Sequence, residues 1–307
     1  MDYDLCNRFS IVFEHYPDEL NSSEEYDIHH IAGIRDYCPK GDSTYNECIT
    51  ELDKINAACL WLFNKNIAYR FDELSNEQFK AFIIYIMIWL NHKLNLNKDD
   101  KTNLNNLYTN YIENDENYIN CKDNGKDCSS TLKENTGYNN FKDAIFKNMD
   151  LLNINFEDIS KFYEAFKLLC KIPTESKEDK LDCKEYLGYA NNIVGKFNEL
   201  NRNSSISGDS SYSKVWSTLS TDYENFKKDY TGINCGDIPS FPSIKITQNH
   251  LQSSDVTSSS LSIVKKLILA LSIFSAITIF LGIFYKFSLF VLRKRAQKQH
   301  LREKLKK

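Results

Sequence analysis

Glycine and proline are scarce in this chain, with only 10 and 5 copies among 307 residues. The sequence has no G-x-G-x-x-G, P-loop, H-E-x-x-H or G-x-S-x-G motif, which argues against a phosphate cradle, a zinc protease site and a nucleophile elbow. His29 and His30 are adjacent, but they lie in a polar stretch where solvated side chains explain them better than a metal or acid–base site. We therefore expect no catalytic residue, no metal, no cofactor, no small-molecule substrate and no enzymatic activity.

The amino terminus lacks an apolar stretch, because MDYDLCNRFS carries acidic residues where a signal peptide carries basic ones. One long uncharged run does occur, LILALSIFSAITIFLGIFY at residues 267–285, in a chain whose mean hydropathy is -0.48. A helix of that length reaches about 28 Å, close to the roughly 30 Å hydrocarbon core of a bilayer. The run predicts one transmembrane helix, which together with its inner interface occupies residues 265–292.

Residues typical of membrane anchors flank this run: Lys265, Lys266, Tyr285, Lys286, Arg293, Lys294 and Arg295. Basic residues are divided unevenly between the two sides, with two lysines before the run and nine Lys or Arg among the last 22 residues. Cytoplasmic flanks carry the excess of basic residues, so we predict a cytoplasmic tail and an exoplasmic body. A tail-anchored protein with its body in the cytosol is the alternative, since the amino terminus does not resemble a signal peptide.

The body is acidic, since residues 1–264 carry 27 basic and 41 acidic side chains, a net charge of -14. This charge repels a phosphate backbone, so nucleic acid is not an expected partner. The basic tail is instead expected to lie against anionic lipid headgroups.

Nine cysteines lie before the apolar run, at irregular spacing and without a Cys-x-x-Cys pair. This pattern argues against zinc and favours disulfides, which form on the oxidising exoplasmic side. We expect a local bridge between Cys121 and Cys128, around the turn-forming KDNGKD, and a staple of a helical hairpin between Cys170 and Cys183. Cys59 shares an apolar helical stripe and is the predicted free thiol. The remaining disulfide candidates, without assigned partners, are Cys6, Cys38, Cys48 and Cys235.

Apolar residues recur every three or four positions through the body, which predicts amphipathic helices. One helix, at residues 44–66, is expected to open with a Thr44-x-x-Glu47 capping box. The next follows Ser75-x-x-Gln78 and contains FKAFIIYIMIWLNHKLN, which is apolar nearly all round and is the expected central core helix. Further helices are expected near the amino terminus and around residues 104–112, 141–149, 155–172, 180–200 and 212–230.

No stretch alternates with period two for long enough to predict a strand, so the expected class is all-α. We predict a disulfide-containing helical ectodomain at residues 1–235, a flexible Ser-rich juxtamembrane stalk at 236–264, the single membrane span at 265–292 and a short basic cytoplasmic tail at 293–307.

Blocks distributed over nearly the whole chain resemble the Plasmodium interspersed repeat (PIR) superfamily, in particular its rodent-malaria branch. In order, they are ELDKINAACLWLF, FIIYIMIWLNHKLN, DISKFYEAFKLLCKI, YSKVWSTLSTDYENFKK and SIFSAITIFLGIFYKFSLFVLRKRAQKQHLREKLK. The resemblance implies a variant antigen, exported without a classical signal peptide toward the parasite or infected red-cell surface. It also implies antigenic variation and immune evasion, and it supplies no catalytic residues.

Two functions remain open at this point. The head is expected to bind an unknown host protein or antibody at the cell surface. The alternative is a structural or trafficking protein that is retained on internal parasite or host-cell membranes and acts through its basic tail.

Overall fold

The computed structural model describes residues 1–19, 26–40, 45–96, 103–123, 126–178, 183–203, 210–229 and 237–244. All of these lie within the first of two units, Met1–Gln248 and Asn249–Lys307. The predicted transmembrane helix, its anchors and the basic tail therefore fall outside the described residues, as does Cys235. Within the described residues, no helix is both long enough and apolar enough to cross a bilayer.

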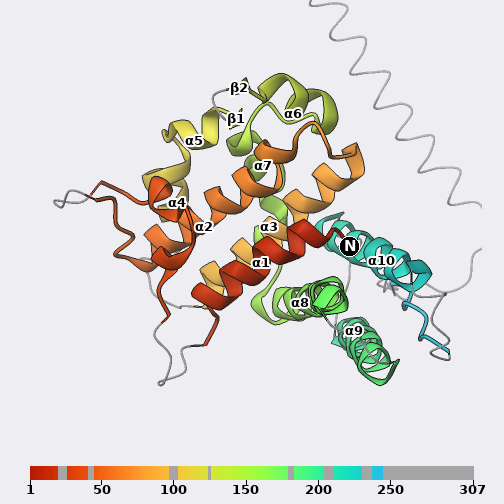
Figure 1. The fold of residues 1–307 in the computed structure, drawn as a ribbon. Helices are drawn as coiled ribbons and strands as arrows, with labels where there is room; N and C mark the ends of the chain where they lie inside the picture. Colours follow the sequence, from red (N-terminus) through yellow and green to blue (C-terminus); the bar gives the residue numbers. More distant parts are fainter. Residues whose placement is uncertain are drawn as a thin grey trace, which may run out of the picture. The chain divides into compact units, whose positions relative to one another are not determined.

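The described body consists mainly of helices (Figure 1). The α-helices are α1 (Tyr3–His15), α2 (Glu51–Asn66), α3 (Asn76–Leu96), α4 (Leu104–Leu107), α5 (Glu116–Ile119), α6 (Ser129–Thr136), α7 (Phe141–Lys147), α8 (Phe156–Glu178), α9 (Cys183–Asn203) and α10 (Ser210–Asp229). Shorter helical segments are η1 (Ile28–His30), η2 (Ile34–Tyr37), η3 (Ala68–Arg70), η4 (Tyr108–Ile112) and η5 (Met149–Asn153). The prediction of a helical body is confirmed.

The body also contains one short β-hairpin, which the all-α prediction did not include. Strand β1 (Lys122–Asp123) pairs antiparallel with β2 (Lys126–Asp127), between the predicted cysteine partners Cys121 and Cys128. Each strand has two residues. A period-two pattern cannot appear over so short a length, which explains why the sequence does not predict these strands.

Helix α3 is the central core helix, as the sequence predicts. It packs against α2, α6, α8, α10 and η5, and its Tyr85, Ile86 and Trp89 are completely buried. Figure 1 shows α8 and α10 on one side of α3 and α6 on another. Because neighbours cover α3 on several sides, apolar residues are needed around most of its circumference.

The starts of α2 and α3 test the two predicted capping boxes. The box at Ser75 is confirmed, since the backbone N–H of Gln78 donates to the Ser75 hydroxyl and the backbone N–H of Ser75 donates to the Gln78 side chain. The box at Thr44 is wrong, because α2 begins at Glu51. Its capping box pairs Thr50 with Asp53. In the segment before the helix, Cys48 forms a disulfide with Cys38.

Three disulfides join described cysteines: Cys6–Cys170, Cys38–Cys48 and Cys121–Cys128. The Cys121–Cys128 prediction is confirmed, and Cys59 is free and buried, as predicted. The predicted Cys170–Cys183 staple is wrong, because Cys170 bonds to Cys6. Cys183 is disulfide-bonded as well.

Aromatic packing between α1 and α8 explains the unexpected Cys6–Cys170 bond. The Phe166 ring on α8 meets the Phe9 ring edge-on, with centroids 4.8 Å apart, and stacks on Tyr85 of α3 at 4.5 Å. This packing lays α1 along α8 and brings the two cysteines together across a sequence separation of 164. No local pattern in the sequence encodes a contact of that range.

The packed body extends beyond residue 235, the predicted end of the ectodomain. The Tyr223 hydroxyl of α10 donates a hydrogen bond to the Pro239 carbonyl at 2.7 Å. The Phe241 ring lies 4.3 Å from the Phe197 ring of α9, and Ile238 and Ile244 also pack against the core. The residues 237–244, which the sequence assigned to the stalk, therefore belong to the body.

The long-range disulfide should stabilise the body more than the local ones. Loop-closure entropy predicts a loss of about 5 kcal/mol for the paired change Cys6→Ala and Cys170→Ala, against about 2 kcal/mol for Cys121→Ala with Cys128→Ala. The expected losses differ because the sequence separation is 164 for Cys6–Cys170 and 7 for Cys121–Cys128. Urea unfolding measures both, with Cys59→Ala as the control that leaves every disulfide intact. An equal loss in the two paired variants would contradict the entropic account.

Candidate functional sites

A charged cluster surrounds Asp18, in the segment that follows α1. The ammonium of Lys93 on α3 lies 3.0 Å from one Asp18 oxygen and donates to the carbonyls of Tyr16 and Pro17. Lys167 on α8 contacts the other oxygen at 2.9 Å, and the Tyr163 hydroxyl donates to Asp18 at 3.2 Å. Burial opposes ionisation of Asp18, but Lys93 and Lys167 outweigh it and hold the pKa of Asp18 below its ordinary value.

His92 of α3 lies beside this cluster. Its ring stacks on Tyr163 at 4.1 Å and on Phe156 at 5.6 Å. Burial lowers the pKa of His92 to about 4; nearby Lys167 and Lys93 add to the effect, while Asp18 opposes it. The imidazole is therefore neutral at neutral pH.

A cavity of about 400 Å³ opens beside His92 and Asp18. Its charged groups are largely paired within the protein, since Asp18 bonds to two lysines and Glu164 pairs with Lys196. Few charges remain for a ligand. The cluster thus joins α1, α3 and α8 and is structural in character.

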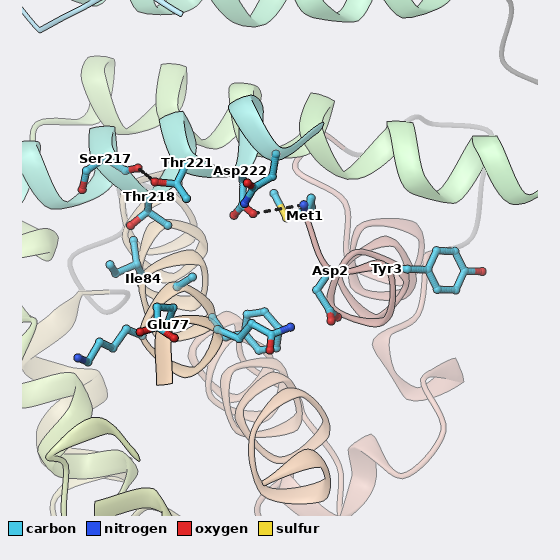
Figure 2. A pocket seen from close by; sticks show the side chains of 14 residues that line it. Met1, Asp2, Tyr3, Glu77, Ile84, Ser217, Thr218, Thr221 and Asp222 are labelled. Carbon is cyan, nitrogen blue, oxygen red and sulfur yellow. Dashed lines mark hydrogen bonds and ion pairs between the residues drawn. The ribbon is translucent and has the colours of Figure 1, made fainter. Parts of the chain in front are cut away.

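A cavity of about 660 Å³ lies between the start of α1, the start of α3 and α10. Figure 2 shows Ser217, Thr218 and Thr221 on the α10 side, facing Glu77 and Ile84 of α3. The three hydroxyls donate to carbonyls of α10 itself, those of Lys214 and Ser217. These donors are therefore already used within the helix.

One end of this cavity is closed by an ion pair, drawn in Figure 2. The terminal ammonium of Met1 lies 3.3 Å from Asp222 of α10, and the Tyr85 hydroxyl donates to the same carboxylate. Both charges are therefore committed to holding α1, α3 and α10 together.

His29, Cys38 and Cys48 form a group whose possible metal-binding atoms all lie within 4.8 Å of one another. The two sulfurs are bonded to each other, so neither is a thiolate that could ligate zinc. His29 also has two protein partners, since its Nδ1 lies 2.6 Å from Asp27 and its Nε2 accepts the backbone N–H of Cys48 at 3.1 Å. The interpretation of His29 as a solvated side chain is wrong, because the ring bridges two segments.

A third, smaller cavity of about 160 Å³ lies beside the disulfide-closed hairpin. Its lining comes from separate parts of the chain: Tyr37, Asn64, Tyr69, Glu116, Asn117, Asn120 and Lys122. The sequence analysis identified none of these residues. No motif could have identified them, because the cavity exists only where η2, α2, η3, α5 and β1 meet.

The described residues form a disulfide-bonded helical body. A solved structure described as "Structure of a Plasmodium PIR protein ectodomain" has a similar fold, with a TM-score of 0.59 and 27% sequence identity over 79% of this chain and 98% of that chain. A family model, "Plasmodium variant antigen protein Cir/Yir/Bir", matches residues 6–286. The chain belongs to this family of Plasmodium variant antigens. No curated protein matches it.

Acid should destabilise the body through His92. Its folded pKa of about 4 lies below the ordinary 6.5, so the unfolded chain binds the proton first as pH falls. The contribution of the neutral ring to the free energy of unfolding is complete above pH 6.5 and is lost as the pH falls from 6.5 to 4. At pH 5 the loss is about 2 kcal/mol. Urea unfolding of the wild type and of His92→Phe, which keeps an aromatic ring, should show a shallower pH dependence for the variant. Parallel pH curves would contradict this.

The Cys59 thiol should be unreactive in the folded protein. Burial raises the pKa of Cys59 to about 12, so almost no thiolate is present at neutral pH. Iodoacetamide is expected to alkylate Cys59 only in denaturant, and non-reducing peptide mapping should recover Cys6 linked to Cys170. Labelling of Cys59 in the native protein, or a Cys170–Cys183 peptide pair, would count against the structure.

Proposed function

We propose that this protein is an exported single-pass surface antigen, whose helical head faces the host and whose basic tail faces the cytosol. Membership of a variant antigen family supports a surface or exported location. The acidic body, the apolar run at 267–285 and the basic residues after it support the orientation. The head then serves host interaction, antigenic variation and immune evasion.

The observation that carries this proposal is the set of disulfides in the described body. Three bonds join described cysteines, and Cys183 is bonded too. Such bonds persist in oxidising compartments and are rare in the cytosol. They therefore favour an exoplasmic head over a body that a tail anchor holds in the cytosol.

The position of one bond also suits an antigen. The Cys121–Cys128 disulfide closes a seven-residue separation around the β1–β2 hairpin, at the surface of the body. Lys122 and Asp127, the residues next to the two cysteines, are exposed. A hairpin fixed at its base can therefore vary in sequence while the fold is kept, which is what evasion of antibodies requires. Its expected partners are a host protein or an antibody.

Topology on infected cells tests the proposal. An antibody against the hairpin peptide, residues 122–127, should label intact cells, whereas one against residues 293–307 should label only permeabilised cells. The apolar run should keep the protein in the membrane fraction through alkaline carbonate extraction. The tail antibody serves as the matched control on the same molecule. Hairpin labelling that needs permeabilisation, or release by carbonate, would refute the proposed orientation.

A further inference from the structure

The small cavity beside the hairpin differs from the other two because every side chain that lines it is polar. We define the hairpin pocket by its lining: Tyr37, Asn64, Tyr69, Glu116, Asn117, Asn120 and Lys122. We propose that the hairpin pocket binds one neutral sugar ring of a glycan. This proposal deepens the proposed function, because it names a class of host ligand for the outward-facing head.

Two tyrosines form one wall of the pocket. Burial, followed by the neighbourhood of Tyr69 and Asp36, raises the pKa of Tyr37. Tyr69 is 41% exposed, and the Lys65 ammonium lies over one face of its ring, 4.3 Å from the centroid. Neutral phenols offer hydroxyl donors and acceptors together with apolar ring surface, which is the combination that a sugar's hydroxyls and C–H groups can use.

Asparagine side chains supply fixed acceptors. Asn64 is only 8% exposed and donates from Nδ2 to the Leu60 carbonyl at 3.0 Å, which fixes the orientation of its amide. Asn117 is held in the same way, by donating to Asp115 at 3.0 Å. Among the described residues, neither side-chain oxygen accepts a hydrogen bond. A solvent-accessible acceptor held in one orientation can accept a hydrogen bond from a ligand.

Charge in the hairpin pocket is balanced. Glu116 and Lys122, which carry opposite charges, are both exposed and line the pocket. A pocket for an anion or a cation would carry an excess of one sign. Paired donors and acceptors without net charge instead suit a neutral polyhydroxylated ligand.

The volume sets the size of the ligand. At roughly 30 Å³ for each water molecule, the cavity of about 160 Å³ has space for only a few waters. Drug-sized molecules need roughly 300 Å³ or more. The pocket therefore accommodates a single sugar ring, with the rest of the glycan in solvent.

Several bonds hold the lining in place before a ligand arrives. The Cys121–Cys128 disulfide and the bond from the Cys128 N–H to the Cys121 carbonyl fix the positions next to Asn120 and Lys122. The buried Tyr118 hydroxyl donates to Asn56 and thereby attaches α5 to α2. A preformed site loses less conformational entropy on binding, which matters for a ligand with few atoms.

Glycan binding by the full-length protein in detergent tests the proposal. On an array of glycans, those ending in neutral hexoses or N-acetylhexosamines should bind, with saturation-transfer NMR of their methyl glycosides as the solution measurement. Tyr69→Ala and Asn117→Ala should each weaken binding about tenfold or more, because they remove a ring face and a fixed acceptor. Tyr45→Ala is the matched control, since Tyr45 is 72% exposed and lies outside the pocket; its binding should equal the wild type.

The sugar site would be overturned if no neutral glycan on the array bound the protein, or if Tyr69→Ala bound as tightly as the wild type. It would also be overturned if binding were restricted to sialylated and sulfated glycans and were abolished by salt. Near-ultraviolet circular dichroism of each variant establishes that it is folded. Purified protein binds glycans whichever side of a membrane the head occupies in the cell. Failure on the array and failure of surface labelling can therefore be told apart.

Discussion

Burial of α3 on several sides is the constraint on which the rest of the body depends. A helix in this position is stabilised when the polar groups that it buries find partners, and the buried polar residues Asn91, His92 and Lys93 follow one another near its carboxyl-terminal end. Asn91 donates to the Leu151 and Ile154 carbonyls of the segment before α8. Lys93 reaches the carbonyls after α1 and the Asp18 carboxylate. Burial of α3 thus dictates where α1, η5 and α8 lie.

The Cys6–Cys170 bond reinforces an arrangement that packing has already produced. Phe166 of α8 lies between Phe9 of α1 and Tyr85 of α3, so three helices meet at one aromatic contact. Next to it, the disulfide removes conformational freedom from the unfolded chain over most of the body's length. The core therefore has few ways to rearrange. Differences between related chains are more easily tolerated outside it.

Local signals in the sequence predicted more of this structure than long-range ones could. The all-round apolar run predicted α3, and the short separation around a polar turn predicted Cys121–Cys128, because both features lie within a few residues. Two capping patterns compete before α2, and the structure uses Thr50 with Asp53, which departs from the Glu or Gln expected at that position. The partner of Cys6 depends on how α1 packs on α8, which no local spacing encodes.

The body contains two kinds of polar cluster, which differ in how much their side chains contribute to holding the fold together. Asp18 bonds to both Lys93 and Lys167 and so joins three structural elements, and a change in any one of the three leaves a partly buried charge without one of its partners. In the hairpin pocket, Tyr69 and Lys122 are exposed, so their side chains contribute little to the core. Substitution there costs the fold little and alters the surface directly. A chain under pressure to change its recognition without unfolding is therefore free to vary the hairpin pocket and is constrained at Asp18.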